Sequence, residues 1–541
     1  KKLLMEADNL KLVFLTGTPM INTLFETAQL FNLLRGYIFT FHFILNEKTN
    51  NTPFDSVVKK MKSHPLIDQV IGKKRDRIIT VTRTPYGFIN NNNNGVTKDA
   101  MNRIDNDTFI EIIKTELGKM NYNSTINIVK NTALPDNEEL FMKLFYDESK
   151  NLMRNPLLYQ SRIMGLVSYF RTQDKSLLPT VTKNVVEEVE MSDYQFLNYS
   201  VVRKDEIDQD KTKKSKSKKP AKKKGSDKSE GDGSLFDDKK SSYRAYSRMH
   251  CSFVFPEAYP RPYPNDLTGA ETDVLNDVLD KQVDPLNDTD DKDEEELKAE
   301  KKLIIKRYEM AKTQILKELD RNKETLFTLD DPEQLLKYSP KYNSIISKIQ
   351  PLNGTAFIYT EYKTLEGIAV LQIVLKANGY APFLLEKNSD GDIIQVFENP
   401  EDVVKPKYAF WGGNAEESDI IRKVYNNEHD ELPLSLKKQI EKTGRDNLRG
   451  DIIKILLTTK TGAEGIDLHN VRQVHIIEPY WNPVRTEQVK GRAVRVGSHT
   501  KLPKKDQTVE IFSYVSKISI KDLKSDKTIL DDSDGMCSDQ V

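Results

Sequence analysis

The chain has 541 residues, enough for about three domains of ordinary size, and its 82 Lys and Arg residues balance 82 Asp and Glu residues. Only two cysteines occur, Cys251 and Cys537, so a disulfide framework or a cysteine-bound zinc site is not expected. No apolar run approaches the roughly 20 residues of a membrane span, and we expect neither a secretion signal nor membrane contact. Zero net charge does not exclude nucleic acid as a partner, because local clusters of charge decide that.

Residues 1–35 are predicted to contain a buried strand and a helix. The apolar run at 12–15 ends at Thr16-Gly17, where a strand would meet a loop, and residues 22–34 place apolar side chains at helical spacing. The chain starts with Lys and reaches this strand almost at once. We therefore expect a fragment of a longer protein. The turn Thr16-Gly17-Thr18-Pro19 by itself indicates only the end of a strand.

Residues 36–200 are predicted to form a mostly helical extension. The following segment, 201–245, has nine lysines between Lys211 and Lys224, and such a run cannot bury apolar surface. We expect it to be disordered, either as a solvated insertion or as a contact for nucleic-acid phosphates.

Residues 246–334 are predicted to be a further insertion. Seven of the nine residues from Asp288 to Glu296 are acidic, and an amphipathic helix follows them.

Residues 335–515 are predicted to form an α/β domain, followed by a tail at 516–541. Strands are expected at 355–360, 407–413, 452–459, 473–479 and 507–515, and helices at 362–376, 417–426 and 484–496. Strands that alternate with helices indicate βαβ units on a parallel sheet. Ligands of such sheets bind at the carboxyl ends of the strands.

A polar stripe is predicted on the helix at 484–496. Gln488, Arg492 and Arg495 are spaced four and three residues apart, so one helical face would present all three. Guanidinium groups make bidentate bonds to phosphate oxygens and stay charged, so the stripe is suited to a polyanion. A solvated surface helix would show the same spacing, and the stripe alone does not decide between the two.

A glycine loop precedes this helix and the strand before it. Gly462 and Gly465 allow close backbone approach, and the Asp467 carboxylate is able to accept hydrogen bonds from a ribose. Because the loop and the helix each follow a strand end, we expect them to share one crevice. The seven histidines show no metal-ligand spacing, so no metal held by this chain is expected.

These motifs resemble those of a known family. The sequences TTKTGAEGIDL (458–468), QVKGRAVRVG (488–497) and LTGTPMIN (15–22) are similar to motifs V, VI and III of the superfamily 2 helicase-like ATPases. FWGG (410–413), followed by Arg422, resembles the second lobe of the Swi/Snf-type branch. The segments VTRTPYGF, RIMGLVSYFR and SRMHCSFVFPEAYPRPYP are similar to helicases of large DNA viruses, such as poxvirus early transcription factor small subunits and nucleoside triphosphatase I.

The resemblance implies an α/β protein with the end of a first RecA-like lobe at 1–35 and a complete second RecA-like lobe at 335–515. In that family the two lobes clamp ATP and bind nucleic acid. The resemblance assigns catalytic contact with phosphate to Arg492 and Arg495, and nucleotide binding to Gly465, Asp467 and Gln488. It assigns nucleic-acid contact to Thr459 and Gly462, and coupling of hydrolysis to movement to Thr16, Gly17, Thr18 and Pro19.

Two further motifs of the family do not occur in the 541 residues. There is no G-x-x-x-x-G-K-[ST] and no Asp-Glu-x-His or Asp-Glu-Ala-Asp. We therefore expect ATP and Mg²⁺ to be bound mainly by a part upstream of this chain, which would be inactive alone. The alternative is a non-catalytic nucleic-acid-binding or scaffold subunit of a transcription complex.

The resemblance also implies partners and a location. Nucleic acid is expected as a partner, with DNA favoured over RNA, together with viral RNA polymerase or transcription factor subunits. A virus with such a protein would use it in the virion or in the viral factory of the host cytoplasm.

Overall fold

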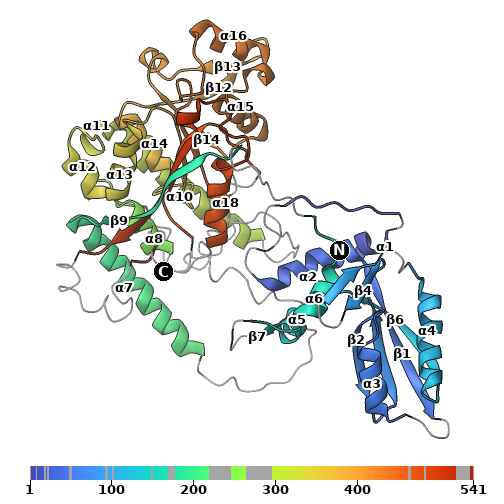
Figure 1. Ribbon diagram of the computed structural model, residues 1–541. Coiled ribbons are helices and arrows are strands. Elements are labelled where there is room, and N and C mark those ends of the chain that lie inside the picture. Colours follow the sequence, from blue (N-terminus) through green and yellow to red (C-terminus); the bar gives the residue numbers. More distant parts are fainter. Residues whose placement is uncertain are drawn as a thin grey trace. The chain divides into compact units, whose positions relative to one another are not determined.

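The computed structural model divides into two compact units, residues 1–171 and 172–541, and each is described by itself (Figure 1). The structure describes residues 2–7, 9–16, 20, 23–47, 52–91, 95–99, 103–147, 150, 152–168, 177–217, 245–262, 295–460, 465–480, 483–519 and 537–539.

The first unit is built around a four-stranded antiparallel sheet in the order β2-β3-β1-β6. With two helices it forms a βαββαβ arrangement: β1 (Tyr37–Glu47), α3 (Phe54–Lys62), β2 (Ile67–Lys73), β3 (Ile78–Arg83), α4 (Asn106–Lys119) and β6 (Tyr122–Thr132). Alternate residues of the central strands, such as Phe41, Phe43 and Val81, are buried in one core with residues of both helices. The sequence predicts a mostly helical region here, and this is wrong because the cross-strand partners of β1 are remote in sequence.

A second core in this unit joins three short helices: α2 (Leu24–Arg35), α5 (Glu138–Phe145) and α6 (Pro156–Ile163). Phe141, Phe145 and Tyr159 pack edge to face within it. A buried ion pair, Arg162 Nε to Asp68 Oδ2 at 2.7 Å, ties α6 to β2. The smaller elements of the unit are α1 (Lys2–Glu6), β4 (Phe88–Asn91), β5 (Gly95–Lys98), β7 (Tyr146–Asp147) and β8 (Leu152–Met153).

The apolar run at 12–15 is not the buried strand that the sequence predicts. It is irregular, and Val13 and Leu15 are 81% and 95% exposed. Within the part of the chain that the structure describes, no strand pairs with this run. An isolated extended segment has neither ladder hydrogen bonds nor a partner face, so apolar composition alone does not bury it.

The second unit contains a seven-stranded parallel sheet in the order β11-β14-β15-β10-β16-β17-β9. This confirms the predicted parallel α/β architecture. Its strands are β9 (Thr180–Glu190), β10 (Thr355–Tyr359), β11 (Ala381–Pro382), β14 (Lys407–Trp411), β15 (Ile455–Thr458), β16 (Val471–Ile476) and β17 (Thr508–Lys517). Strand β9 lies far upstream of the region 335–515 and adds to the sheet by pairing with β17.

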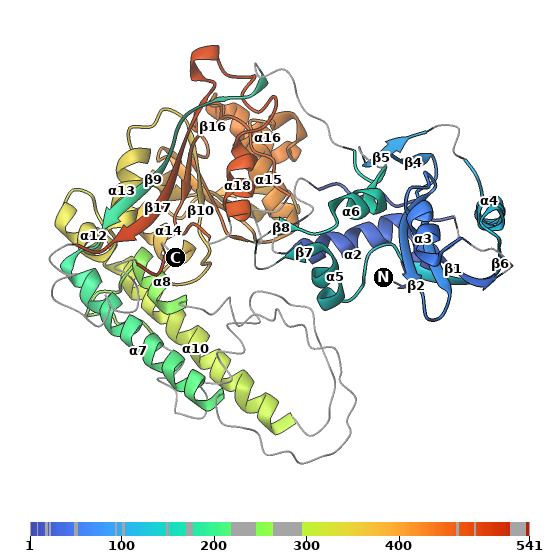
Figure 2. The ribbon, with the colours of Figure 1, turned by 60° about the horizontal axis from the view of Figure 1, so that its bottom comes forward.

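Helices cover both faces of this sheet, and Figure 2 shows them on its two sides. Alternate residues of β10 separate the two cores: Ala356 and Ile358 pack with α13 and α14, whereas Phe357 and Tyr359 pack with α15, α16 and α18. The bounds are α13 (Pro340–Ile349), α14 (Ile368–Ala377), α15 (Ala415–Tyr425), α16 (Leu434–Thr443) and α18 (Pro483–Ala493). Burial on both faces explains why these strands are continuous apolar runs.

The remaining elements of the second unit are helices and one hairpin. They are α7 (Asp193–Ser217), α8 (Ala245–Ser252), α10 (Glu295–Arg321), α11 (Lys323–Leu326), α12 (Pro332–Tyr338), β12 (Leu384–Lys387) with β13 (Ile393–Val396), and the 3-10 turns η4 (Pro400–Val403), η5 (His429–Glu431) and η6 (Lys504–Asp506). No described helix is long and apolar enough to cross a membrane.

The Lys-rich insertion predicted at 201–245 is helical in its first part. Helix α7 continues through Lys211 to Ser217, because the segment that precedes the lysines is anchored by buried residues such as Tyr199 and Ile207. Residues 218–244 and the acidic stretch before Glu295 lie outside the described residues.

The sheet buries a histidine whose titration should affect stability. His475 on β16 is fully buried, with Nδ1 2.8 Å from the Tyr514 hydroxyl and its ring stacked on Phe512. Burial, with a smaller effect of the nearby Lys348, lowers the pKa of His475 to about 3. Between pH 6.5 and 3 the unfolded chain therefore binds a proton that the folded chain does not, so the free energy of unfolding falls as pH falls.

We expect His475→Gln to reduce this acid sensitivity. On lowering the pH from 6.5 to 5, the wild type should lose about 2 kcal/mol more stability than the variant, since each pKa unit corresponds to about 1.4 kcal/mol. Urea unfolding at several pH values measures the difference. Parallel pH dependence of the two proteins would contradict the prediction.

Candidate functional site

The carboxyl edge of the second sheet is closed by internal hydrogen bonds. Thr458, the last residue of β15, donates from Oγ1 to the Trp411 carbonyl at 2.9 Å, and Thr459 after it is only 7% exposed. Beyond β16, the fully buried Glu478 accepts hydrogen bonds from Thr360 Oγ1 at 2.8 Å and from the Glu361 backbone at 3.0 Å. Burial raises the pKa of Glu478, although Lys341 and these donors oppose the shift.

A loop leads from this carboxyl edge to the amino end of β16. Gly465 has φ +84°, a conformation that L side chains rarely adopt, so glycine is required there. The loop then contacts the end of α18, since the Leu468 amide donates to the Arg492 carbonyl at 3.3 Å. Asn470, the last residue before β16, donates from its backbone to the Ser498 carbonyl at 3.0 Å.

Asp467 and Arg495 meet across this contact. Arg495 Nη1 lies 3.1 Å from Asp467 Oδ1, and the side chains are 42% and 49% exposed. A pair this exposed contributes about 0–1 kcal/mol to folding, so it is weak and reversible. Arg495 Nε also donates to the Gly491 carbonyl at 3.3 Å. A guanidinium held in this way can transfer to a stronger acceptor such as phosphate.

The predicted stripe of three residues is shorter in the structure. Helix α18 ends at Ala493, so Gln488 and Arg492 share its face but Arg495 lies in the turn beyond. The turn forms because Gly497 takes a left-handed conformation, φ +77°, and donates to the Leu177 carbonyl at 2.7 Å. Gln488, Arg492 and Arg495 are all half-buried.

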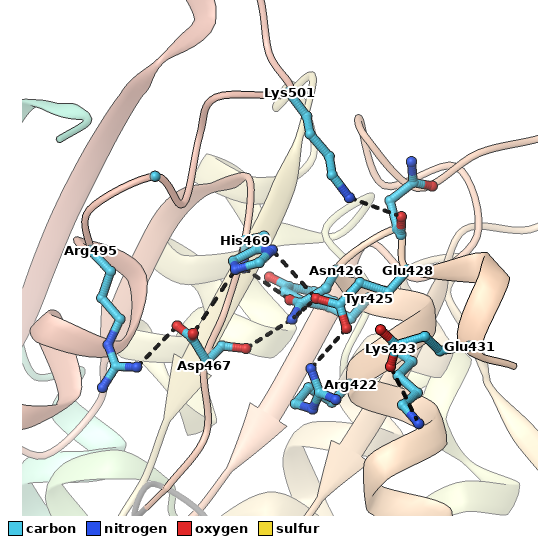
Figure 3. A network of polar contacts seen from close by, with 12 residues as sticks. Arg422, Lys423, Tyr425, Asn426, Glu428, Glu431, Asp467, His469, Arg495 and Lys501 are labelled. Atoms are coloured by element: carbon cyan, nitrogen blue, oxygen red, sulfur yellow. Dashed lines mark hydrogen bonds and ion pairs between the residues drawn. The ribbon is translucent and has the colours of Figure 1, made fainter. Parts of the chain in front are cut away.

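Further polar residues surround Asp467, as Figure 3 shows. His469 Nε2 lies 4.0 Å from Asp467 Oδ2, and His469 Nδ1 lies 3.4 Å from Glu428 Oε1. Glu428 Oε2 in turn pairs with Arg422 Nη1 at 2.9 Å. Sequence analysis did not indicate Glu428, because it is remote from Asp467 in sequence. It also did not indicate His469, which lies two residues after Asp467 but just outside the motif 458–468.

The predicted site residues therefore fall into two groups. Asp467 and Arg495 meet near the amino end of β16, where the backbone of Arg492 also bonds the loop, whereas Thr459 lies at the carboxyl edge. Gly465 lies two residues before Asp467, and Gln488 lies on α18. The loop and the end of the helix therefore meet as expected, but beside the amino end of β16 rather than at the carboxyl ends of the strands. Thr16 lies in an irregular segment of the other unit, and Gly17, Thr18, Pro19 and Gly462 lie outside the described residues.

The charges of this site suit an anionic ligand rather than a metal ion. Arg495 supplies a guanidinium beside the half-exposed Asp467 carboxylate, and such a group stays charged and binds phosphate well. Among the residues that the structure describes, no group of three or more His, Cys, Asp or Glu side chains is arranged to hold a metal.

Known helicase-like proteins are similar in sequence to this chain. Residues 415–497, which include the whole cluster around Asp467, match the family model of the helicase conserved C-terminal domain. A termination factor NPH-I homolog of African swine fever virus is 27% identical over 397 residues, which is 71% of this chain and 46% of the relative. A putative ATP-dependent RNA helicase of Acanthamoeba polyphaga mimivirus is 25% identical over 451 residues, which is 77% of this chain and 48% of the relative.

Among solved structures, the C-terminal part of the Fun30 ATPase domain aligns with 64% of this chain and 88% of its own length, at 16% identity and a TM-score of 0.31. The matched region spans about half the length of the viral relatives.

Proposed function

We propose that this chain, which carries a helicase C-terminal domain and is related to the helicase-like proteins of large DNA viruses, supplies the second lobe of an ATP-driven motor on nucleic acid. The observation that carries the proposal is the weak Asp467–Arg495 pair at the end of α18. It presents a guanidinium that stays charged and can exchange its carboxylate for a phosphate.

Each predicted site residue has a role in this proposal. Arg492 and Arg495 stabilise the charge that develops on the transferring phosphoryl group, as arginine fingers do. Gly465, Asp467 and Gln488 contact the nucleotide, and Thr459 and Gly462 contact the nucleic-acid backbone. Thr16, Gly17, Thr18 and Pro19 couple hydrolysis to movement.

Binding of the ATP phosphates and of Mg²⁺ needs residues outside these 541. The sequence has no phosphate-binding loop with its Lys and Ser/Thr, and the described residues offer no cluster of carboxylates for a metal. We therefore propose that the 541-residue chain is inactive by itself and becomes part of an active ATPase with those residues present.

The nucleic acid is proposed to be DNA and the process viral transcription. One relative is named a termination factor, and the resemblance of residues 410–413 to the Swi/Snf-type branch implies movement along duplexes. Viral RNA polymerase or transcription factor subunits are the proposed protein partners, in the virion or the viral factory.

The test compares two proteins in one ATPase assay. The complete gene product that contains these residues should hydrolyse ATP and accelerate with duplex DNA, and the 541-residue chain should not hydrolyse ATP. RNA and single-stranded DNA at several salt concentrations serve as comparisons, since phosphate contacts weaken steeply with salt. A complete product that binds nucleic acid but never hydrolyses ATP would instead identify a scaffold subunit.

A further inference from the structure

The corner after α15 holds the backbone of the loop that carries Asp467. Asn426 is fully buried, and its Nδ2 donates to the Asp467 carbonyl at 2.9 Å. Its Oδ1 accepts from the His469 amide, also at 2.9 Å. One amide side chain thus bonds the main chain on both sides of Leu468. These two hydrogen bonds hold the loop at the end of α15 and fix the position of the Asp467 backbone.

The side chains at the same corner form a row in which two carboxylates alternate with Arg and His side chains, and the row ends at Arg495 (Figure 3). Arg422 pairs with Glu428 at 2.9 Å, Glu428 with His469 at 3.4 Å, His469 with Asp467 at 4.0 Å, and Asp467 with Arg495 at 3.1 Å. Exposure rises along the row, from 23% and 18% for Arg422 and Glu428 to 49% and 42% for Asp467 and Arg495. The row is therefore anchored at its less exposed end.

We propose that Glu428 and His469 are positioning residues, which act through Asp467 to set the place of Arg495. An exposed ion pair holds two flexible side chains only weakly. Here Asn426 holds the backbone of Asp467, and His469 Nε2 lies 4.0 Å from the second carboxylate oxygen of Asp467. The guanidinium of Arg495 is then held in one position rather than in many. This inference rests on the proposed function, in which Arg495 meets the phosphate.

The test uses the complete gene product with Glu428→Gln and His469→Ala. Loss of the row should lower kcat about 10- to 100-fold, as displacement of a catalytic group by about 1 Å does. The KM for ATP should change much less than kcat, because Arg495 acts in the transition state and Gly465 and Gln488 still contact the nucleotide. His469→Gln keeps a donor between the two carboxylates and should recover most of the lost kcat.

Glu431→Gln is the matched control. Glu431 lies on η5, close to Glu428 in sequence, but its carboxylate pairs with Lys423 at 3.7 Å and is 65% exposed. This variant should keep the wild-type kcat. The thermal unfolding midpoint of each variant is measured alongside, to separate a shift of Arg495 from general loss of structure.

The outcomes separate the two proposals. If Arg495→Ala abolishes turnover while Glu428→Gln and His469→Ala keep the wild-type kcat, the positioning role is overturned and the proposed function stands. If kcat falls only in step with the unfolding midpoint, or KM rises as much as kcat falls, the role is structural and the inference also fails. Full turnover by Arg495→Ala would overturn the proposed function itself.

Discussion

Arg495→Ala in the complete gene product should lower ATP turnover about 10³-fold or more, the range measured for arginine fingers. The side chain makes one exposed ion pair, with Asp467 at 3.1 Å, and one bond to the Gly491 carbonyl. Removing it therefore takes away little folding energy, since such pairs contribute about 0–1 kcal/mol. The expected effect falls on the rate of hydrolysis and not on stability.

Two measurements check this expectation. Steady-state kinetics should show the loss in kcat, and a fluorescent ATP analogue should bind the variant nearly as well as the wild type. The control is Arg445→Ala, which changes an exposed arginine of the same unit outside the site. This variant should keep the wild-type kcat and the wild-type affinity for the ATP analogue. Equal turnover by Arg495→Ala and the wild type would show that Arg495 is a surface feature.

Asp539→Ala should cost about 3–5 kcal/mol of stability, the usual effect of removing one partner of a buried ion pair. Lys341 Nζ lies 2.6 Å from Asp539 Oδ2, and both side chains are almost completely buried. Burial lowers the pKa of Lys341, but Asp539, Cys251 and Glu478 together outweigh burial and the net shift is upward. Asp539 Oδ2 also accepts from the Ser516 amide at 3.0 Å, so the variant leaves that amide without this acceptor and the Lys341 ammonium with only the Ile477 carbonyl at 3.0 Å.

A double variant tests the cause of this loss. Lys341→Met combined with Asp539→Leu removes both charges and should recover much of the stability, because no buried charge is left unpaired. Glu188→Ala, which breaks the exposed Lys517–Glu188 pair, should change stability by less than about 1 kcal/mol. Urea unfolding measures all three. A cost for Asp539→Ala as small as that for Glu188→Ala would contradict the prediction.

Short-range patterns in the amino-acid sequence specify the local elements of the second unit. The apolar runs that became β14, β15, β16 and β17, and the helical spacing that became α15 and α18, are short-range patterns of two and 3.6 residues, so the chain shows them directly. The loop around Gly465 and Asp467 was likewise visible from its glycines. These features placed the parallel sheet in the correct part of the chain.

Tertiary structure alone decided which remote residues meet. Nothing local distinguishes β9 as the partner of β17, or Asp539 as the partner of Lys341. The same holds for the row from Glu428 to Arg495, whose members come from two helix ends and a loop. Such contacts depend on the connections between elements, which bring distant segments together. Local periodicity does not indicate these contacts. For the same reason the run at 12–15 looked like a strand, although no described strand pairs with it.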